Sequence, residues 1–428
     1  MKFNKHTLVI AFAMFSLFFG AGNLILPPFL GYNSGSGWFF VAVGFAVSAV
    51  AIPVLAIYAH ARLQGTILDF ATKVSPRFAL LYSFLVYGVI VALPAPRTAS
   101  VTFEIAFQPY FKTSSLLFSA VYFALVMVFS LNRTQLLELI GKFLTPIIII
   151  ILMCIIGIGV FAETETMRAP IFPNTFTAGI LEGYQTFDAI GGIVVGGVIV
   201  ISLGLQKKYN YAQKKQMIAH AGLLSGLGLF LIYGGLIAVG AFNSAALSID
   251  NRTQLLIALS KNTLGSIGTT FLGVLVALAC FTTAVGIITG TADFIKKIAG
   301  NSQTAFVVTV IVGCALGVAV GQFDVQYIIA IALPVLTLIY PITIVLIVLN
   351  CIPNKYATAL VFRAVTIATL LFTLPDFLGF VLGGTTVGPL KNAIPLANEG
   401  LGWVLPAVVV FVVANLFFAK PEKSRPVA

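Results

Sequence analysis

Residues 12–31, FAMFSLFFGAGNLILPPFLG, form an apolar stretch that is long enough to cross a membrane but contains two helix-breaking clusters. The run Gly20–Asn23 lies in its middle, and Pro27 and Pro28 follow. Glycine weakens a helix interior and proline lacks the amide hydrogen, so the sequence predicts an interruption partway across the bilayer. Backbone groups freed in hydrocarbon are costly unless protein, an ion or a polar ligand satisfies them. The interruption therefore indicates a binding site, although a kinked packing helix would give the same pattern.

The composition of the chain is typical of a membrane protein. Of its 428 residues, 59% are hydrophobic and only 9% are charged, with a mean hydropathy of +1.07, whereas about a quarter of the residues of soluble domains are charged. The apolar runs do not alternate as lipid-facing strands do, so we expect an all-α polytopic protein in the lipid bilayer, without a soluble domain. At about 20 residues per span, the runs predict about twelve transmembrane helices: residues 7–31, 37–60, 78–107, 114–131, 140–162, 177–205, 216–242, 265–295, 304–322, 325–349, 358–378 and 402–419.

The net charge of +11 follows membrane topology and does not indicate a nucleic-acid partner. Basic residues concentrate in cytoplasmic loops of membrane proteins. With the N-terminus placed inside, all lysines and arginines fall on the cytoplasmic side except Arg97, which lies within a span, and five on the outer side: Lys112, Arg168, Arg252, Lys261 and Lys391. We therefore expect a multi-pass protein of the cell membrane with both termini in the cytoplasm.

The sixth span repeats the peculiarity of the first. Its sequence TFDAIGGIVVGGVIVISLGL, residues 186–205, contains Asp188 and the pairs Gly191-Gly192 and Gly196-Gly197 in an apolar stretch. Five spans separate the two glycine-rich segments, so a second repeat would enter the membrane from the opposite side, which is typical of inverted-repeat transporters with discontinuous helices. We expect one membrane domain over residues 1–428, with repeats at 7–162 and 177–349 and two additional helices at 358–419.

The ends of the half-helices predict where ligands bind. Amide hydrogens that begin a half-helix favour an anionic group, and carbonyls that end one favour a cation. In the first span we expect the amides to bind a carboxylate at Ala21, Gly22 and Asn23. We expect the carbonyls to bind a cation around Ser16, Phe18 and Phe19.

The eighth span contains a small and hydroxylated face. In LACFTTAVGIITGTADF, residues 278–294, Ala279, Thr282 and Thr283 lie at helical spacing. The two hydroxyls and nearby carbonyls would suit a small hard cation such as Na⁺. The alternative is that each hydroxyl bonds the carbonyl of its own helix, as membrane threonines commonly do.

Among the charged residues within predicted spans, where charge is costly and often functional, three are candidate site residues: Asp188, Arg97 and Glu104. Asp188 could ligate a cation, bind a substrate ammonium group, carry a proton, or be a structural carboxylate with a partner. Arg97 and Glu104 lie seven residues apart on one helix face. They could join a gate, or bridge to each other through water.

The sequence does not indicate ATP hydrolysis, metal binding or enzymatic catalysis. There is no phosphate-binding G-x-x-x-x-G-K-[ST] loop, so ATP hydrolysis is not expected. The four cysteines lack metal-ligand spacing. No nucleophile, base and orienting residue converge in the motifs. We therefore expect a protein that is not an enzyme, with no cofactor and no obligate protein partner.

Four segments carry a resemblance to a known family. LFFGAGNLILPPFLG, PRTASVTFE, GYQTFDAIGG and FTTAVGIITGTADF resemble the branched-chain amino acid:cation symporter family, within the amino acid, polyamine and organocation transporters. The resemblance extends over essentially the whole chain. It implies a fold of two inverted five-helix repeats plus two helices, and uptake of leucine, isoleucine and valine with Na⁺ or H⁺.

The resemblance also implies positions for the ligands. The substrate would contact Ala21, Gly22, Asn23, Asp188, Gly191 and Gly192. A sodium site would comprise Ser16, Phe19, Ala279, Thr282 and Thr283, and a second cation site Phe18, Asn23 and Asp188. Proton-coupled relatives often have a lysine in the middle of the fifth span, whereas Lys142 lies near its start, which favours Na⁺, while Asp188 keeps H⁺ open. Alternatives are a symporter for another neutral amino acid or small solute, and a nutrient sensor or channel with a transporter fold.

Overall fold

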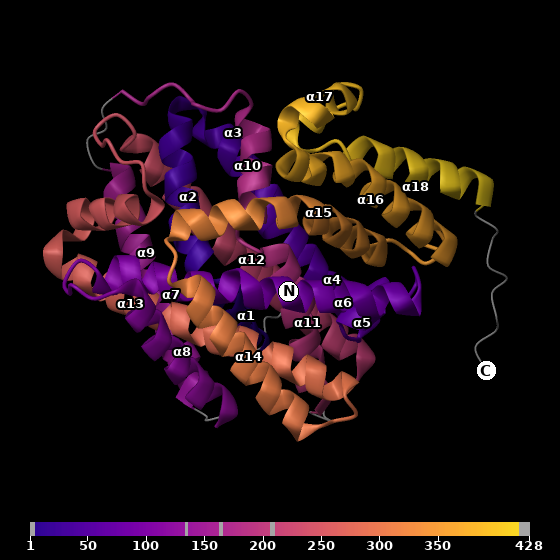
Figure 1. Cartoon of the computed structure of the whole chain (residues 1–428), viewed down its shortest axis with the longest axis horizontal. Coiled ribbons are helices and arrows are strands. Elements are labelled where there is room, and N and C mark those ends of the chain that lie inside the picture. The colour runs from indigo at the N-terminus through magenta and orange to yellow at the C-terminus, as the bar shows by residue number, and fades with distance from the viewer. Residues whose placement is uncertain (1–4, 133–135, 162–165, 206–209, 419–428) are drawn as a thin grey trace. The chain divides into compact units, whose positions relative to one another are not determined.

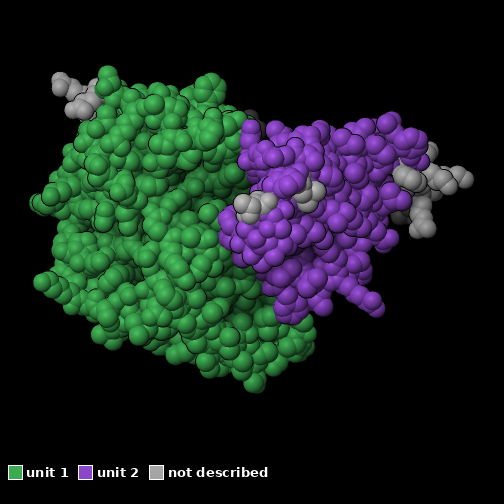
Figure 2. All heavy atoms as spheres, turned by 45° about the horizontal axis from the view of Figure 1, so that its top comes forward, with its two compact units in different colours: residues 1–50, 86–188, 223–333 green, residues 51–85, 189–222, 334–428 purple. Residues whose placement is uncertain are grey.

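The computed structural model describes residues 5–132, 136–161, 166–205 and 210–418. It divides into two compact units, coloured separately in Figure 2. Unit 1 comprises Met1–Val50, Val86–Asp188 and Leu223–Leu333, and unit 2 comprises Ala51–Leu85, Ala189–Gly222 and Pro334–Ala428. Both termini lie outside the described residues, as do some of the basic residues predicted to be cytoplasmic: Lys2, Arg133, Lys207, Lys208, Lys420, Lys423 and Arg425.

The described residues are helical at every predicted span and contain no strand, which confirms the all-α class. The helices are α1 (Lys5–Phe18), α2 (Ala21–Ser34), α3 (Trp38–Ala46), α4 (Ile52–Leu63), α5 (Ile67–Ala71), α6 (Pro76–Ala92), α7 (Pro94–Thr102), α8 (Ser115–Leu131), α9 (Leu136–Phe161), α10 (Thr175–Tyr184), α11 (Asp188–Leu205), α12 (Tyr211–Phe242), α13 (Arg252–Ile298), α14 (Gln303–Gly321), α15 (Val325–Cys351), α16 (Ala359–Leu382), α17 (Gly384–Asn392) and α18 (Val404–Phe418). Two π-helical segments, η2 (Val47–Ala51) and η3 (Phe103–Phe107), extend α3 and α7.

Seven of the described helices or helix runs are long and apolar enough to cross a membrane. They include the continuous run Ala21–Leu63 and the 47-residue helix α13. Four shorter apolar helices, among them Thr7–Phe18 and Ser115–Leu131, add to these. The chain is therefore an integral membrane protein, and the number of crossings stays a prediction.

Close helix contacts in unit 1 hold the helices that carry the predicted interruptions. A Cβ at Gly31 of α2 would lie 1.9 Å from the carbonyl oxygen of Ile237, and one at Gly240 of α12 would lie 1.9 Å from that of Pro28. Helices α3 and α10, which lie side by side in Figure 1, meet in the same way at Gly44. Only glycine permits this approach, which is how membrane helices commonly pack. The backbones of α2 and α10 are thus fixed close to the interruptions.

The helix of the eighth span begins earlier than predicted. The side chain of Asn251 accepts a hydrogen bond from the Thr253 amide at 2.9 Å and caps α13. The chain then kinks at Gly265, whose φ of +69° favours glycine. The segment from Arg252 to the kink thus forms a helix that precedes the predicted span.

Unit 2 contains the helices of the C-terminal part and all of α11 after its first residue, Asp188. Helices α17 and α18 both pack against α16 (Figure 1). Lys391 of α17 forms an ion pair with the buried Asp376 of α16 at 2.7 Å. The buried His60 of α4 bonds the carbonyl of Ile193 in α11 at 2.6 Å. These contacts are internal to unit 2.

Candidate functional site

The first predicted interruption is present, between α1 and α2. Helix α1 ends at Phe18 and α2 begins at Ala21, with Gly20 in an extended conformation. The Gly20 amide donates to Oδ1 of Asn23 at 3.1 Å, so the asparagine side chain caps the second half-helix. The first amides of a helix have no partner within it. The start of α2 therefore presents donors at the break, as expected from the sequence.

The second interruption lies before the glycines that the sequence indicated, and ends four positions before Gly191. Helix α10 ends at Tyr184, Gln185–Phe187 are outside a helix, and α11 begins at Asp188. The hydroxyl of Thr186 donates to the Gly183 carbonyl at 2.8 Å and accepts from the Asp188 amide at 3.2 Å, and Phe187 has a φ of +63°. A side-chain hydroxyl and a strained residue thus end and restart the helix.

Gly191 and Gly192 lie inside the first turns of α11, so they do not form the interruption. A Cβ at Gly192 would lie 2.9 Å from Cβ of Ala56, both within unit 2. Close packing against α4 is the physical reason for a glycine there. The prediction that this pair opens the sixth helix is therefore corrected.

The predicted residues Asn23 and Asp188 meet in a buried cluster of unit 1. Asn23 Nδ2 donates to Oδ1 and Oδ2 of Asp188 at 3.0 and 2.8 Å, and the hydroxyl of Tyr233 donates to Oδ2 at 2.9 Å. The three residues are 1% to 3% exposed. A buried carboxylate is tolerated when donors satisfy its oxygens. This cluster joins α2 to the start of α11 and to α12.

Arg97 occupies the space between the two interruptions. This residue of α7 is 3% exposed, and its Nη1 donates to the carbonyl oxygen of Gln185 at 2.8 Å. A Cβ at Gly22 would lie 2.5 Å from Nη2 of Arg97 and 3.4 Å from that same carbonyl oxygen. Asp188 attracts the guanidinium electrostatically. The arginine therefore contacts the start of the second half-helix in one span and the break in the other.

Glu104 has partners different from those of Arg97. One carboxylate oxygen accepts from the Thr253 hydroxyl at 2.5 Å, and the other accepts from the Val325 amide at 2.9 Å. Beside it, Arg252 forms an ion pair with Glu182 at 2.8 Å. The two residues that the sequence grouped as a gate thus belong to separate networks, because η3 places Glu104 near the beginnings of α13 and α15.

The two threonines predicted to bind a cation in the eighth span bond their own helix, but Thr283 is also close to the first interruption. The hydroxyls of Thr282 and Thr283 both donate to the Ala279 carbonyl at 2.9 Å, as in the alternative interpretation. A Cβ at Gly20 would nevertheless lie 3.6 Å from Cγ2 and 3.8 Å from Oγ1 of Thr283. Thr283 therefore faces the first interruption. The remaining predicted ligands lie in the last turn of α1 or directly after it. Ser16 is half-buried, and Phe18 and Phe19 are buried.

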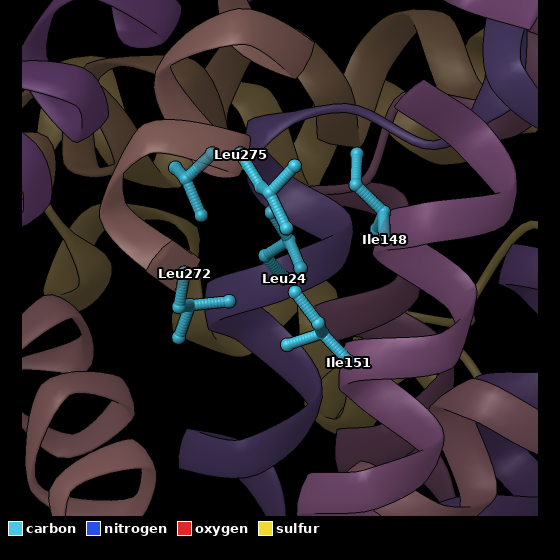
Figure 3. A pocket seen from close by; sticks show the side chains of 6 residues that line it. Leu24, Ile148, Ile151, Leu272 and Leu275 are labelled. Atoms are coloured by element: carbon cyan, nitrogen blue, oxygen red, sulfur yellow. The ribbon is translucent and has the colours of Figure 1, made fainter. Parts of the chain in front are cut away.

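An apolar crevice lies between α2, α9 and α13 (Figure 3). It is lined by aliphatic side chains alone: Leu24, Ile148, Ile151, Leu272, Leu275 and Val276. None of these side chains can replace the water around a charged group. The crevice is therefore unsuited to an ammonium or carboxylate group.

Sequence reasoning missed Gln185 and Tyr233. Gln185 is fully buried, and neither atom of its side-chain amide has a partner among the described residues. A glutamine in an apolar span three residues before Asp188 is the signal that could have identified it. Tyr233 lies 45 residues from Asp188 in an ordinary apolar helix, so nothing local marks it.

Comparisons with known proteins show the fold and the class of protein. A solved structure described as "Inward facing conformation of Mhp1" matches with a TM-score of 0.63 and 12% identity, over 96% of this chain and 90% of that chain. At this identity the likeness establishes the fold alone. Residues 3–420 match the family model described as "Branched-chain amino acid transport protein", and the chain belongs to that family.

Curated relatives agree with this membership. The branched-chain amino acid permease BraB of Bacillus subtilis is 34% identical, over 98% of this chain and 97% of the relative. The branched-chain amino acid transport system 2 carrier protein of Pseudomonas aeruginosa is 32% identical, over 97% and 98%. The family resemblance of the sequence motifs is thus confirmed, and the relatives are transport proteins rather than enzymes.

Proposed function

We propose that this protein is a secondary active symporter that imports leucine, isoleucine and valine together with a cation, Na⁺ or H⁺. Its family and the printed names of its relatives support the substrate class. The observation that carries the proposal is the buried cluster of Asn23, Asp188 and Tyr233, together with the buried Arg97, at two interrupted helices. Interrupted helices in transporters bind substrate and ions at their free backbone groups.

The zwitterionic head of the substrate suits the two ends of this cluster. Its carboxylate would bind the first amides of α2, at Ala21, Gly22 and Asn23, where the helix dipole favours negative charge. Its ammonium group would bind the carbonyls of the second break and Asp188. Since one methylene changes affinity by only about 1–3 kcal/mol, leucine, isoleucine and valine should compete for one site.

The cation would bind beside the first interruption. Carbonyls at the end of α1, at Ser16 and Phe19, and the Ala279 carbonyl would supply oxygens with the hydroxyls of Thr282 and Thr283. The proximity of Thr283 to Gly20 supports this site. Phe18, Asn23 and Asp188 remain candidates for a second cation, and Asp188 for a proton. A cation that stabilises the broken segment would favour substrate binding, and the coupling is reciprocal.

The topology completes the proposal. We also propose twelve crossings with both termini in the cytoplasm, two inverted repeats over residues 7–162 and 177–349, and two additional helices at 358–419. Glu104, which joins the beginnings of α13 and α15, would belong to an outer gate that closes over the site.

Uptake by the purified full chain in proteoliposomes tests the function. We expect radiolabelled leucine to accumulate above its external concentration under an imposed inward Na⁺ or H⁺ gradient, with competition by isoleucine and valine. Accumulation of another neutral solute in preference to these would favour the alternative substrate. Leucine that equilibrates without accumulating under either gradient would favour a channel or sensor and contradict symport.

The double substitution Thr282→Ala and Thr283→Ala tests the cation site. We expect the Na⁺ concentration for half-maximal uptake to rise roughly tenfold, since losing hydrogen-bonding oxygens costs about 1–2 kcal/mol. Thr291→Ala is the matched control, because this threonine of α13 also bonds its own helix, at the Ile287 carbonyl. An unchanged Na⁺ dependence in the double variant would remove the pair from the site.

A further inference from the structure

Two sources of positive charge, a helix N-terminus and a guanidinium group, meet between the two interruptions in unit 1. The first amides of α2 already form the positive end of a helix dipole. Nη2 of Arg97 lies 2.5 Å from the position of a Cβ on Gly22, within that first turn. A guanidinium and a helix N-terminus repel each other, but together they attract an anion. Their convergence favours a carboxylate at this point.

Buried polar atoms around Arg97 also point to a ligand. Among the described residues, Nε of Arg97 and both side-chain amide atoms of Gln185 have no hydrogen-bond partner. Gln185 is fully buried and Arg97 is 3% exposed. Buried polar groups in proteins are nearly always paired, so unpaired ones at a candidate site require an explanation. Donors and an acceptor beside the break are the groups that the head of an amino acid would satisfy.

The carbonyl that Arg97 bonds in this structure is also a suitable acceptor for the substrate. Its Nη1 donates to the main-chain carbonyl of Gln185 at 2.8 Å. That carbonyl lies at the second break, near the position where an ammonium group would bind beside Asp188. Arg97 therefore occupies, with its own positive charge, an acceptor suited to the positive group of a zwitterion.

We propose that Arg97 is a specificity-determining residue that binds the substrate carboxylate, and that it leaves the Gln185 carbonyl to the substrate ammonium when it does so. This inference rests on the proposed function, because it assumes that an amino acid binds between the two breaks. Arg97 and Asp188 attract each other electrostatically, and each matches one end of a zwitterion. Amines and carboxylic acids that lack one of the two charges are then rejected.

Competition by leucine analogues against radiolabelled leucine binding tests this role in the purified full chain at constant pH and salt. The probes are leucinamide, which lacks the carboxylate, and 4-methylpentanoate, which lacks the ammonium group. In the unmodified protein we expect leucinamide to bind roughly 100-fold more weakly than leucine, as for other buried charged hydrogen bonds. In Arg97→Gln this ratio should fall below about tenfold, because leucine loses its charged partner and leucinamide does not.

Two variants serve as controls. Arg168→Gln removes an arginine that also donates to a main-chain carbonyl, that of Leu247 at 2.8 Å, but lies away from the breaks, so its ratio should equal that of the unmodified protein. Arg97→Lys keeps the charge without the planar fork, so its ratio should be intermediate. If Arg97→Gln does not fold, the ratio measured for Arg97→Lys tests the role of Arg97.

The outcomes separate this inference from the proposed function. If the unmodified protein binds leucine and both Arg97 variants retain the full discrimination against leucinamide, Arg97 does not bind the carboxylate, and the transport proposal stands. If the unmodified protein binds no branched-chain amino acid, the proposed function itself fails. A merely structural role of Arg97 would weaken leucine and leucinamide binding equally and leave their ratio unchanged.

Discussion

Replacing Gly22 with leucine should lower leucine binding and uptake by roughly 100-fold, because an added side chain overfills a packed site at a cost of about 1–3 kcal/mol. A Cβ at this position already lies 2.5 Å from Nη2 of Arg97 and 3.4 Å from the Gln185 carbonyl oxygen. The remaining atoms of leucine would fill the space between the two breaks. Binding of radiolabelled leucine to purified protein, followed by uptake into proteoliposomes, measures the effect.

Gly88→Leu is the matched control for this substitution. Gly88 lies in α6 of unit 1, and a Cβ there would meet nothing within 4 Å. We expect this variant to bind leucine like the unmodified protein. Normal leucine affinity in Gly22→Leu would place the substrate elsewhere. The smaller change Gly22→Ala should displace only the flexible end of Arg97 and have a smaller effect.

Replacing Asp188 with asparagine should reduce uptake by at least roughly 100-fold, since an uncompensated buried charge costs about 3–5 kcal/mol. The carboxylate balances Arg97 and accepts three hydrogen bonds from Asn23 and Tyr233. An asparagine keeps the size of the side chain but turns one acceptor into a donor that faces other donors. Uptake and leucine binding of the folded variant, with its thermal stability, separate loss of function from loss of fold.

Asp324→Asn provides the control for the loss of one carboxylate. Asp324 precedes α15, and its Oδ1 accepts from the Tyr327 amide at 2.7 Å. Asparagine caps a helix about as well as aspartate, so uptake should be unchanged. If Asp188→Asn transports leucine normally, this carboxylate takes no part in binding substrate or cation.

The first interruption could be predicted from the sequence because glycine and proline act locally on the backbone. The second interruption could not be placed, because no glycine forms it. Phe187 adopts a φ of +63°, against the preference of an aromatic residue, and the Thr186 hydroxyl stabilises the break. The glycines that attracted attention pack α11 closely against its neighbour instead.

Local sequence patterns also could not predict which residues contact one another at the site. Asn23 and Asp188 are 165 residues apart, and Arg97 and Gln185 are 88 residues apart. Charge within a span marked Asp188 and Arg97 as functional candidates, but only the packing of α7 against α2 and α13 assigns Arg97 to the breaks and Glu104 to another network.

The most direct test of the central claim is a structure of the full chain determined in a lipid environment with leucine bound. We expect the head of the amino acid between the start of α2 and residues Gln185–Asp188, with its carboxylate toward Gly22 and its ammonium group toward the Gln185 carbonyl. Leucine bound at another place, or unbroken helical hydrogen bonding through Gly20 and Thr186, would contradict the account.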